Sequence, residues 1–225
     1  MTPLRVEIDL ATPWVPPAHG VHLDGLIAWA VADACMEDPD CTQAQIDAAL
    51  DALPLGRHRT ADGRWCWQAS LLGAVDPGGL YRHFATAKTD ADALAHGLVN
   101  GTIEGRKTID LVRGMTKNDL YRFSSQHVTQ LRAWCIGDAE AVALALARVQ
   151  HVGGRGRLGF GTIKRNAGGG TAVRVVNDPD AEHRWLQRHL PEAPALPDYA
   201  AIEGRCIPPY WQSAAGQKVW RPISA

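Results

Sequence analysis

The sequence has 225 residues and a mass of 24.3 kDa, with 46% apolar and 21% charged residues, a composition that supports a buried core and argues against a disordered chain. The formal net charge is −1, which taken alone argues against a strongly basic nucleic-acid-binding protein. The charge is unevenly distributed, however. Residues 1–100 carry 6 Lys and Arg against 13 Asp and Glu, whereas residues 101–165 carry 11 against 5. A basic middle segment can form one cationic face, which would attract the phosphate backbone of a nucleic acid.

The sequence also argues against membrane, secreted and metal-binding proteins. No apolar run approaches 18 residues, and residues 1–5 lack the charged and apolar regions of a signal peptide. The five cysteines are widely spaced and form no C-x-x-C pair, and His19, His22 and Asp24 lack an evident fourth metal ligand. We therefore expect a cytoplasmic protein with reduced, mostly buried thiols and no metal or other cofactor.

The first third of the chain predicts one strand and two helices. Residues 4–10 alternate apolar and charged side chains with period two, which is typical of a half-buried strand. A loop with three prolines follows at residues 12–20. Residues 23–36 are apolar nearly all round, which predicts a buried helix. Residues 42–53 predict a second helix, with Thr42 as its N-cap.

The next segment contains a strand pattern and a long stretch without a clear period. Trp65 and Trp67 alternate with polar residues within residues 64–74, which predicts a strand and favours a core or partner-interface role for both rings. Residues 76–79 form an Asp-Pro-Gly-Gly turn. Residues 80–126 hold scattered charges and several glycines. A segment of this length without elements is usually either functional or wrongly assigned as a loop, and we expect an insertion at about residues 76–126.

After the insertion the sequence becomes regular again. Residues 127–136 predict a strand, and residues 139–150 predict a helix with Asp138 as its N-cap. Residues 153–161 then contain five glycines and two arginines. Residues 162–176 read as a hairpin with three glycines at its turn.

The order of these elements is close to β-α-β-β-α-β, the split βαβ arrangement of the ferredoxin-like (RRM-like) fold, in the α+β class. We expect one such domain over residues 1–177. Residues 178–225 would form a C-terminal extension packed on it, with one amphipathic segment at residues 181–190.

The glycine-rich segment does not match the common phosphate-binding loops. It has no G-K-[S/T], and it lies between a helix and a strand, the reverse of the context that a dinucleotide-binding loop requires. Glycines allow close approach of another backbone, and Arg155 and Arg157 carry forked donors suited to phosphate. With Lys164 and Arg165 they would suit the sugar-phosphate backbone of RNA. A flexible turn with solvated arginines remains the alternative.

Three blocks of the sequence resemble one known family. The segment Gly-Gly-Arg-Gly-Arg-Leu-Gly-Phe-Gly-Thr-Ile at residues 153–163 looks like the G-loop of the RAMP superfamily of CRISPR-associated proteins. Residues 11–13 (Ala-Thr-Pro) with 22–30 (His-Leu-Asp-Gly-Leu-Ile-Ala-Trp-Ala), and residues 113–117 (Arg-Gly-Met-Thr-Lys), are similar to the Cas-five-like (Csf-three type) subunit of type IV effector complexes. The resemblance covers roughly residues 1–176.

The resemblance implies a non-catalytic subunit that binds the 5′ handle of the guide RNA (crRNA). Its partners would be the sibling RAMP backbone subunit, the large subunit and, indirectly, target DNA. Tyr121 and Phe123 lie among the insertion's cations and are candidates to stack on bases. The candidate RNA-binding residues are Gly153, Gly154, Arg155, Gly156, Arg157, Lys164, Arg165, Arg106, Lys107, Arg113, Lys117, Arg122, Tyr121 and Phe123.

Two other functions stay open. One is a metal-independent endoribonuclease that processes precursor crRNA, which needs a general base; the candidates are His22, His83 and His151. The other is an enzyme unrelated to RNA that binds a nucleotide through the glycines. Asp24 either orients a basic residue or stabilises the N-terminal end of its helix, and of these we favour the second.

Overall fold

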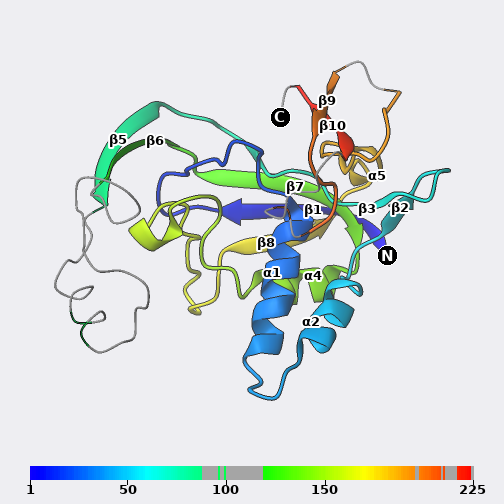
Figure 1. Ribbon diagram of the computed structural model, residues 1–225, viewed down its shortest axis with the longest axis horizontal. Coiled ribbons are helices and arrows are strands. Elements are labelled where there is room, and N and C mark those ends of the chain that lie inside the picture. The colour runs from blue at the N-terminus through cyan, green and yellow to red at the C-terminus, as the bar shows by residue number, and fades with distance from the viewer. Residues whose placement is uncertain are drawn as a thin grey trace. The chain divides into compact units, whose positions relative to one another are not determined.

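The structure is a computed structural model that describes residues 1–87, 96, 99, 119–195, 198–208, 210 and 217–223 (Figure 1). The chain has a mixed α+β architecture with antiparallel sheets. It divides into two compact units, one formed by Met1–Gly79 with Gln126–Ala225 and the other by Leu80–Ser125.

A four-stranded sheet forms the centre of the first unit. Its strand order is β4 (Gly73–Ala74), β7 (Gln130–Gly137), β1 (Thr2–Asp9) and β8 (Val173–Asn177), and every neighbouring pair is antiparallel. The alternation predicted for residues 4–10 is confirmed in β1, where Leu4, Val6 and Ile8 are completely buried.

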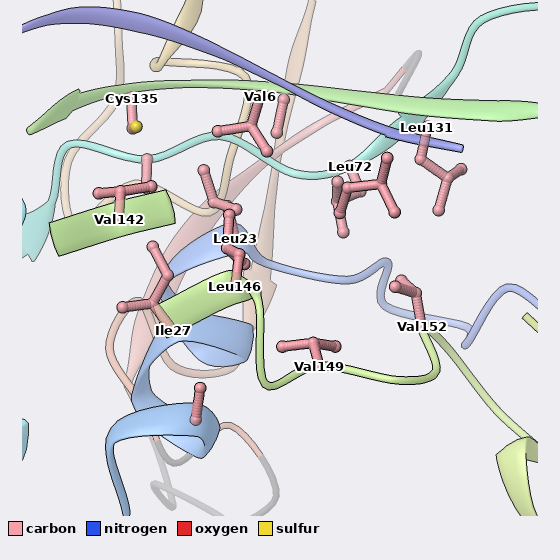
Figure 2. Packing of buried hydrophobic residues seen from close by; sticks show 14 of the residues in the cluster. Val6, Leu23, Ile27, Leu72, Leu131, Cys135, Val142, Leu146, Val149 and Val152 are labelled. Atoms are coloured by element: carbon pink, nitrogen blue, oxygen red, sulfur yellow. The ribbon is translucent and has the colours of Figure 1, made fainter. Parts of the chain in front are cut away.

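Two helices contribute to the main core beside this sheet. Figure 2 shows Leu23 and Ile27 of α1 (Leu23–Met36) and Val142 and Leu146 of α4 (Ala139–Leu146) packed in one cluster with Val6 of β1. The predicted bounds of α1 are confirmed at both ends. We conclude that the apolar side chains of both helices form a common core with the central strand.

The predicted helix caps are also present. Thr42 begins α2 (Gln43–Leu50) with a capping box, in which its hydroxyl accepts from the Gln45 amide while the Gln45 side chain accepts from the Thr42 amide. Asp138 begins α4 by accepting from the Ala141 amide at 2.9 Å. Each cap satisfies an amide that the helix itself leaves without an acceptor.

The charged side chains of β1 pair with both neighbouring strands. Glu7 is opposite Arg132 in β7 and Arg174 in β8, and its carboxylate lies 3.3 Å and 3.1 Å from their guanidinium nitrogens. Asp9 bonds Arg174 and Gln130. The acidic side chains of β1 are therefore neutralised by basic side chains of the neighbouring strands on this face of the sheet.

The single strand predicted at residues 64–74 is wrong. Trp65–Trp67 forms β3 and pairs with β2 (Arg57–Arg59), whereas Gly73–Ala74 forms β4 in the central sheet. The change of partner occurs over residues 68–70. The Gln68 amide donates to the Gly56 carbonyl, but its carbonyl accepts from the Ile136 amide of β7, and Ser70 exchanges hydrogen bonds with Trp134 of β7. Sequence alternation reports burial on two faces and does not reveal which neighbouring strand supplies the hydrogen bonds.

The C-terminal part of the chain, which begins at residue 178, packs against β3 through a second apolar cluster. This cluster contains Cys66, Trp185, Leu190, Cys206 and Val219. Within the amphipathic segment at residues 181–190, four residues form a helix, α5 (Ala181–Arg184). The proline-rich segment beyond it contains two strands that the sequence did not predict, β9 (Tyr199–Glu203) and β10 (Lys218–Pro222), which pair antiparallel.

The thiols are free, as expected. Cys66, Cys135 and Cys206 are buried, whereas Cys35 and Cys41 are half-buried. Burial raises the pKa of Cys66 and of Cys135 to about 12, which keeps both as neutral thiols at physiological pH.

The second unit contains a two-stranded sheet, which we call the β5–β6 sheet, formed by β5 (Leu80–Ala87) and β6 (Asp119–Gln126). Neither strand was predicted from the sequence pattern. Within the described part of the chain, no helix is both long and apolar enough to cross a membrane.

Candidate nucleic-acid interface

The glycine-rich loop is a closed turn with a short helix at its tip. His151 and Thr162 pair across its base, and the Val152 amide donates to the Gly161 carbonyl at 2.8 Å. The tip is a single 3-10 turn, Gly156–Leu158. Arg155 precedes this turn with φ +63°, a left-handed conformation that is uncommon for a residue with a side chain.

The loop is attached to the segment that follows β1. The Gly154 amide donates to the Val15 carbonyl at 2.9 Å, and the Gly161 amide donates to the Pro13 carbonyl at 2.8 Å. The Thr162 amide donates to the Thr12 hydroxyl at 2.9 Å. These three bonds hold both ends of the loop against residues 12–15, about 140 positions earlier in the chain.

Two glycines are required by this close packing. A Cβ at Gly153 would lie 2.5 Å from Trp14 Nε1, and a Cβ at Gly161 would lie 2.0 Å from the Val152 carbonyl oxygen. Both glycines also have positive φ, at +88° and +63°. Because the amides of Gly154 and Gly161 bond the protein itself, the glycines position the loop rather than presenting all their amides to an anion.

The packing leaves the cationic side chains of the loop at the surface. Arg155 and Arg157 are exposed at the tip, and Lys164 and Arg165 are exposed on the segment that leaves the loop. Arg165 donates to the Gly169 carbonyl at 3.0 Å. Four side chains of one sign thus project from a backbone that is fixed by hydrogen bonds.

The remaining predicted cations are placed only in part. Arg122 is exposed on β6 in the second unit. Arg106, Lys107, Arg113 and Lys117 lie outside the described residues. Whether they form one surface with Arg155 and Arg157 therefore stays a prediction.

The two candidate base-stacking residues form an aromatic row on β6. The ring centroids of Tyr121 and Phe123 lie 6.2 Å apart at 28°, and Phe123 stacks on His83 at 4.9 Å and 18°. All three side chains are half-buried. The row has the parallel ring geometry that a base could extend.

The three histidines considered for catalysis have different environments. His22 is buried, and neither ring nitrogen has a hydrogen-bond partner among the described residues. His83 shares a 2.7 Å hydrogen bond with the Ser125 hydroxyl. His151 is exposed at the base of the loop, with Nδ1 3.2 Å from the Thr162 hydroxyl. His151 thus combines exposure with a position at the base of the loop that carries Arg155 and Arg157.

A buried ion pair joins α1 to the C-terminal part. Asp24 and Arg188 are both completely buried, and Arg188 Nη2 lies 3.2 Å from Asp24 Oδ2. The same carboxylate oxygen accepts from the Tyr210 hydroxyl at 2.6 Å. Arg188 also donates to the carbonyl groups of Trp67, Ala69, Cys206 and His189 and to the Tyr210 hydroxyl.

Asp24 therefore positions a basic residue, which the sequence reasoning ranked second. Asp24 does lie in the first turn of α1, but a fully buried carboxylate interacts most strongly with its ionic partner. Sequence analysis missed Arg188 and Tyr210. Residues 185–190 (Trp-Leu-Gln-Arg-His-Leu) mix apolar and polar side chains, so no local pattern marks this arginine as buried.

The cluster shifts the pKa values of its titratable groups. Burial raises the pKa of Asp24, and the charge of Arg188 opposes that rise. Burial, followed by the charge of Arg188, lowers the pKa of His22 well below its ordinary value. Burial likewise lowers the pKa of His189 to about 4. Both imidazoles are neutral at pH 7, and His22 stacks flat on the Tyr210 ring at 4.1 Å.

The block His22–Gly25 is thus the docking point of the C-terminal part. A Cβ at Gly25 would lie 3.2 Å from the Tyr210 ring, so the glycine makes room for that ring.

No group of three or more potential metal ligands occurs among the described residues.

Comparison with known families decides the identity. Residues 2–222 match the family described as CRISPR type IV associated protein Csf3. The chain belongs to the Csf3 family. The resemblance based on residues 11–13, 22–30, 113–117 and 153–163 is confirmed, and it extends over nearly the whole chain. A comparison with curated proteins finds no match.

Csf3 membership makes this chain a component of a type IV CRISPR system. The match also includes the C-terminal part, which the sequence-based resemblance did not cover. The buried Asp24–Arg188 pair therefore joins two regions of a single Csf3 chain.

Proposed function

We propose that this Csf3 chain binds the 5′ handle of the crRNA in a type IV effector complex and has no catalytic activity of its own. The observation that carries the proposal is the G-loop, whose backbone is held by Thr12, Pro13 and Val15 while Arg155 and Arg157 are exposed. A guanidinium fork on a fixed backbone suits phosphate oxygens. Lys164 and Arg165 would extend the contact along the segment that leaves the loop.

The topology supports assigning the ferredoxin-like RAMP fold to residues 1–177. The strand order β4-β7-β1-β8, with all pairs antiparallel, is the order that a β-α-β-β-α-β chain produces when α1 and α4 connect its strands. Residues 80–125 form their own compact unit, which supports an insertion at about residues 76–126. Residues 178–225 would be an extension fixed by Arg188.

The proposed RNA surface also includes residues of the insertion. We assign Tyr121 and Phe123 to base stacking, and Arg106, Lys107, Arg113 and Lys117 to phosphate contacts. The proposed protein partners are the sibling RAMP backbone subunit and the large subunit, with target DNA contacted only indirectly. The cytoplasm is the proposed location.

Co-purification tests this proposal. The tagged chain, expressed with its type IV complex and CRISPR array, is expected to carry RNA of uniform guide length. R155A/R157A should retain much less of it, because two exposed phosphate donors are lost from a backbone that is otherwise unchanged. The control R59A/R64A removes the same charge from β2 and the turn before β3 and should retain RNA as the wild type does. Equal RNA recovery in both variants would contradict the proposal.

A second candidate function is metal-independent cleavage of precursor crRNA, and it is favoured by one observation only. His151 is exposed beside the loop arginines and bonds Thr162, an arrangement in which an imidazole can act as a general base. We expect repeat RNA incubated with the purified chain in EDTA to stay intact. Cleavage that disappears in His151→Ala would establish the nuclease instead.

A further inference from the structure

The two faces of the β5–β6 sheet differ in burial. The His83 ring bonds Ser125 and stacks on Phe123, so these three side chains point to one face. Successive side chains of a strand point to opposite faces, which places the even-numbered residues 80–86 and 120–124 on the other face. We call this second surface, defined by Leu80, Arg82, Phe84, Leu120 and Arg122, the apolar-basic face.

The apolar-basic face exposes large hydrophobic side chains. Leu80 is 63% exposed, Phe84 is 66% exposed and Leu120 is 68% exposed. On the opposite face Tyr81 is 55% exposed, whereas His83, Tyr121 and Phe123 are half-buried and Ser125 is buried. Single exposed apolar residues are common on protein surfaces, but three large ones on one face of a small sheet form a patch. Such patches mark interaction sites.

The charge on this face is of one sign. Arg82 and Arg122 are exposed between the apolar residues. No acidic side chain occurs among those that the structure describes in the β5–β6 sheet, at residues 80–86 and 120–126. A partner that buries the face must therefore supply carboxylates for two guanidinium groups, since an unpaired buried charge is costly.

The apolar side chains indicate a protein partner rather than RNA. Two of the three are leucines, which have no ring on which a base could stack, whereas the aromatic row lies on the other face. Arginine and aromatic anchors with aliphatic neighbours are typical of a protein–protein interface core. Burial of these exposed leucines against an apolar ridge of a partner protein is favourable, because it removes apolar surface from water.

We propose that the apolar-basic face docks a second protein subunit, which presents an apolar ridge flanked by carboxylates. This assigns Arg122 to a protein contact, although the sequence grouped it with the RNA-binding residues. The inference rests on the proposed function only for the existence of an assembled complex. RNA retention is read separately in the test below, so the two can fail independently.

Photo-crosslinking in the assembled complex tests the docking. Phe84→p-benzoylphenylalanine, expressed with the complex, is expected to crosslink on irradiation to one co-purifying protein subunit. Mass spectrometry should place the crosslink in an apolar segment that contains Asp or Glu. Leu144→p-benzoylphenylalanine is the matched control, because Leu144 is 74% exposed on α4 and lies outside the face. It should not give that crosslink.

A second variant tests the energetic contribution of the face. F84S/L120S replaces two exposed side chains, so the chain should fold, and it should lower recovery of the crosslinked subunit about tenfold or more at unchanged RNA retention. L144S should recover the subunit as the wild type does. A crosslink to RNA, no protein crosslink in the assembled complex, or full subunit recovery with F84S/L120S would each overturn the proposal. Loss of RNA from R155A/R157A would leave it intact.

Discussion

Arg188→Ala is expected to lower the free energy of unfolding by roughly 3–5 kcal/mol, as removal of one partner from a buried ion pair typically does. Arg188 and Asp24 are completely buried, and Arg188 is the donor to four carbonyl groups as well as to Asp24. The variant leaves a buried carboxylate with Tyr210 as its remaining donor. Urea unfolding, followed by tryptophan fluorescence, measures the effect.

Two control variants distinguish the effect of breaking the buried pair from the effect of removing a charge. Arg184→Ala removes an exposed arginine on α5 that lies 3.8 Å from Asp180, and it should cost less than about 1 kcal/mol. The double variant D24N/R188M removes both charges and should recover part of the loss, because no buried charge is then left unpaired. A cost below about 1 kcal/mol for Arg188→Ala would show that the pair does not hold the C-terminal part on α1.

Gly161→Ala is expected to destabilise the chain by roughly 3 kcal/mol, through steric overlap and backbone strain together. The new Cβ would lie 2.0 Å from the Val152 carbonyl oxygen, at a residue with φ +63°. The overlap involves backbone atoms and cannot be relieved by rotating a side chain. Relief would require breaking the bond from the Val152 amide to the Gly161 carbonyl.

Gly159→Ala is the matched control for this prediction. Gly159 also has positive φ, at +83°, but a Cβ there would meet no heavy atom within 4 Å. We expect a cost of about 1 kcal/mol, from the backbone conformation alone. The difference in unfolding free energy between the two variants measures the close packing of the loop. Equal destabilisation would contradict the role given to Gly161.

Local sequence patterns predicted the elements that are defined by contacts within a few residues. The apolar run at residues 23–36 predicts α1 with its observed ends, and Thr42 and Asp138 cap the helices that they were expected to begin. A cap or a helical stripe is decided within a few residues, so the sequence shows it directly.

Features that depend on distant contacts were predicted poorly. The division of residues 64–74 into two strands depends on the hydrogen bonds between Ser70 and Trp134. The role of Arg188 depends on its contacts with Asp24 and Tyr210. The glycines and arginines of residues 153–161 single out the glycine-rich loop, but nothing in the sequence reveals its attachment to Thr12, Pro13 and Val15. A single sequence carries no record of which distant segments meet.

The salt dependence of crRNA-handle binding tests the proposed RNA contact most directly. The logarithm of the affinity should fall linearly with the logarithm of salt concentration, with a slope of about −0.7 for each phosphate contact to single-stranded RNA. R155A/R157A should therefore weaken binding and reduce the steepness of the slope by about 1.4, whereas R59A/R64A should change neither. An unchanged slope and affinity in R155A/R157A would contradict the account.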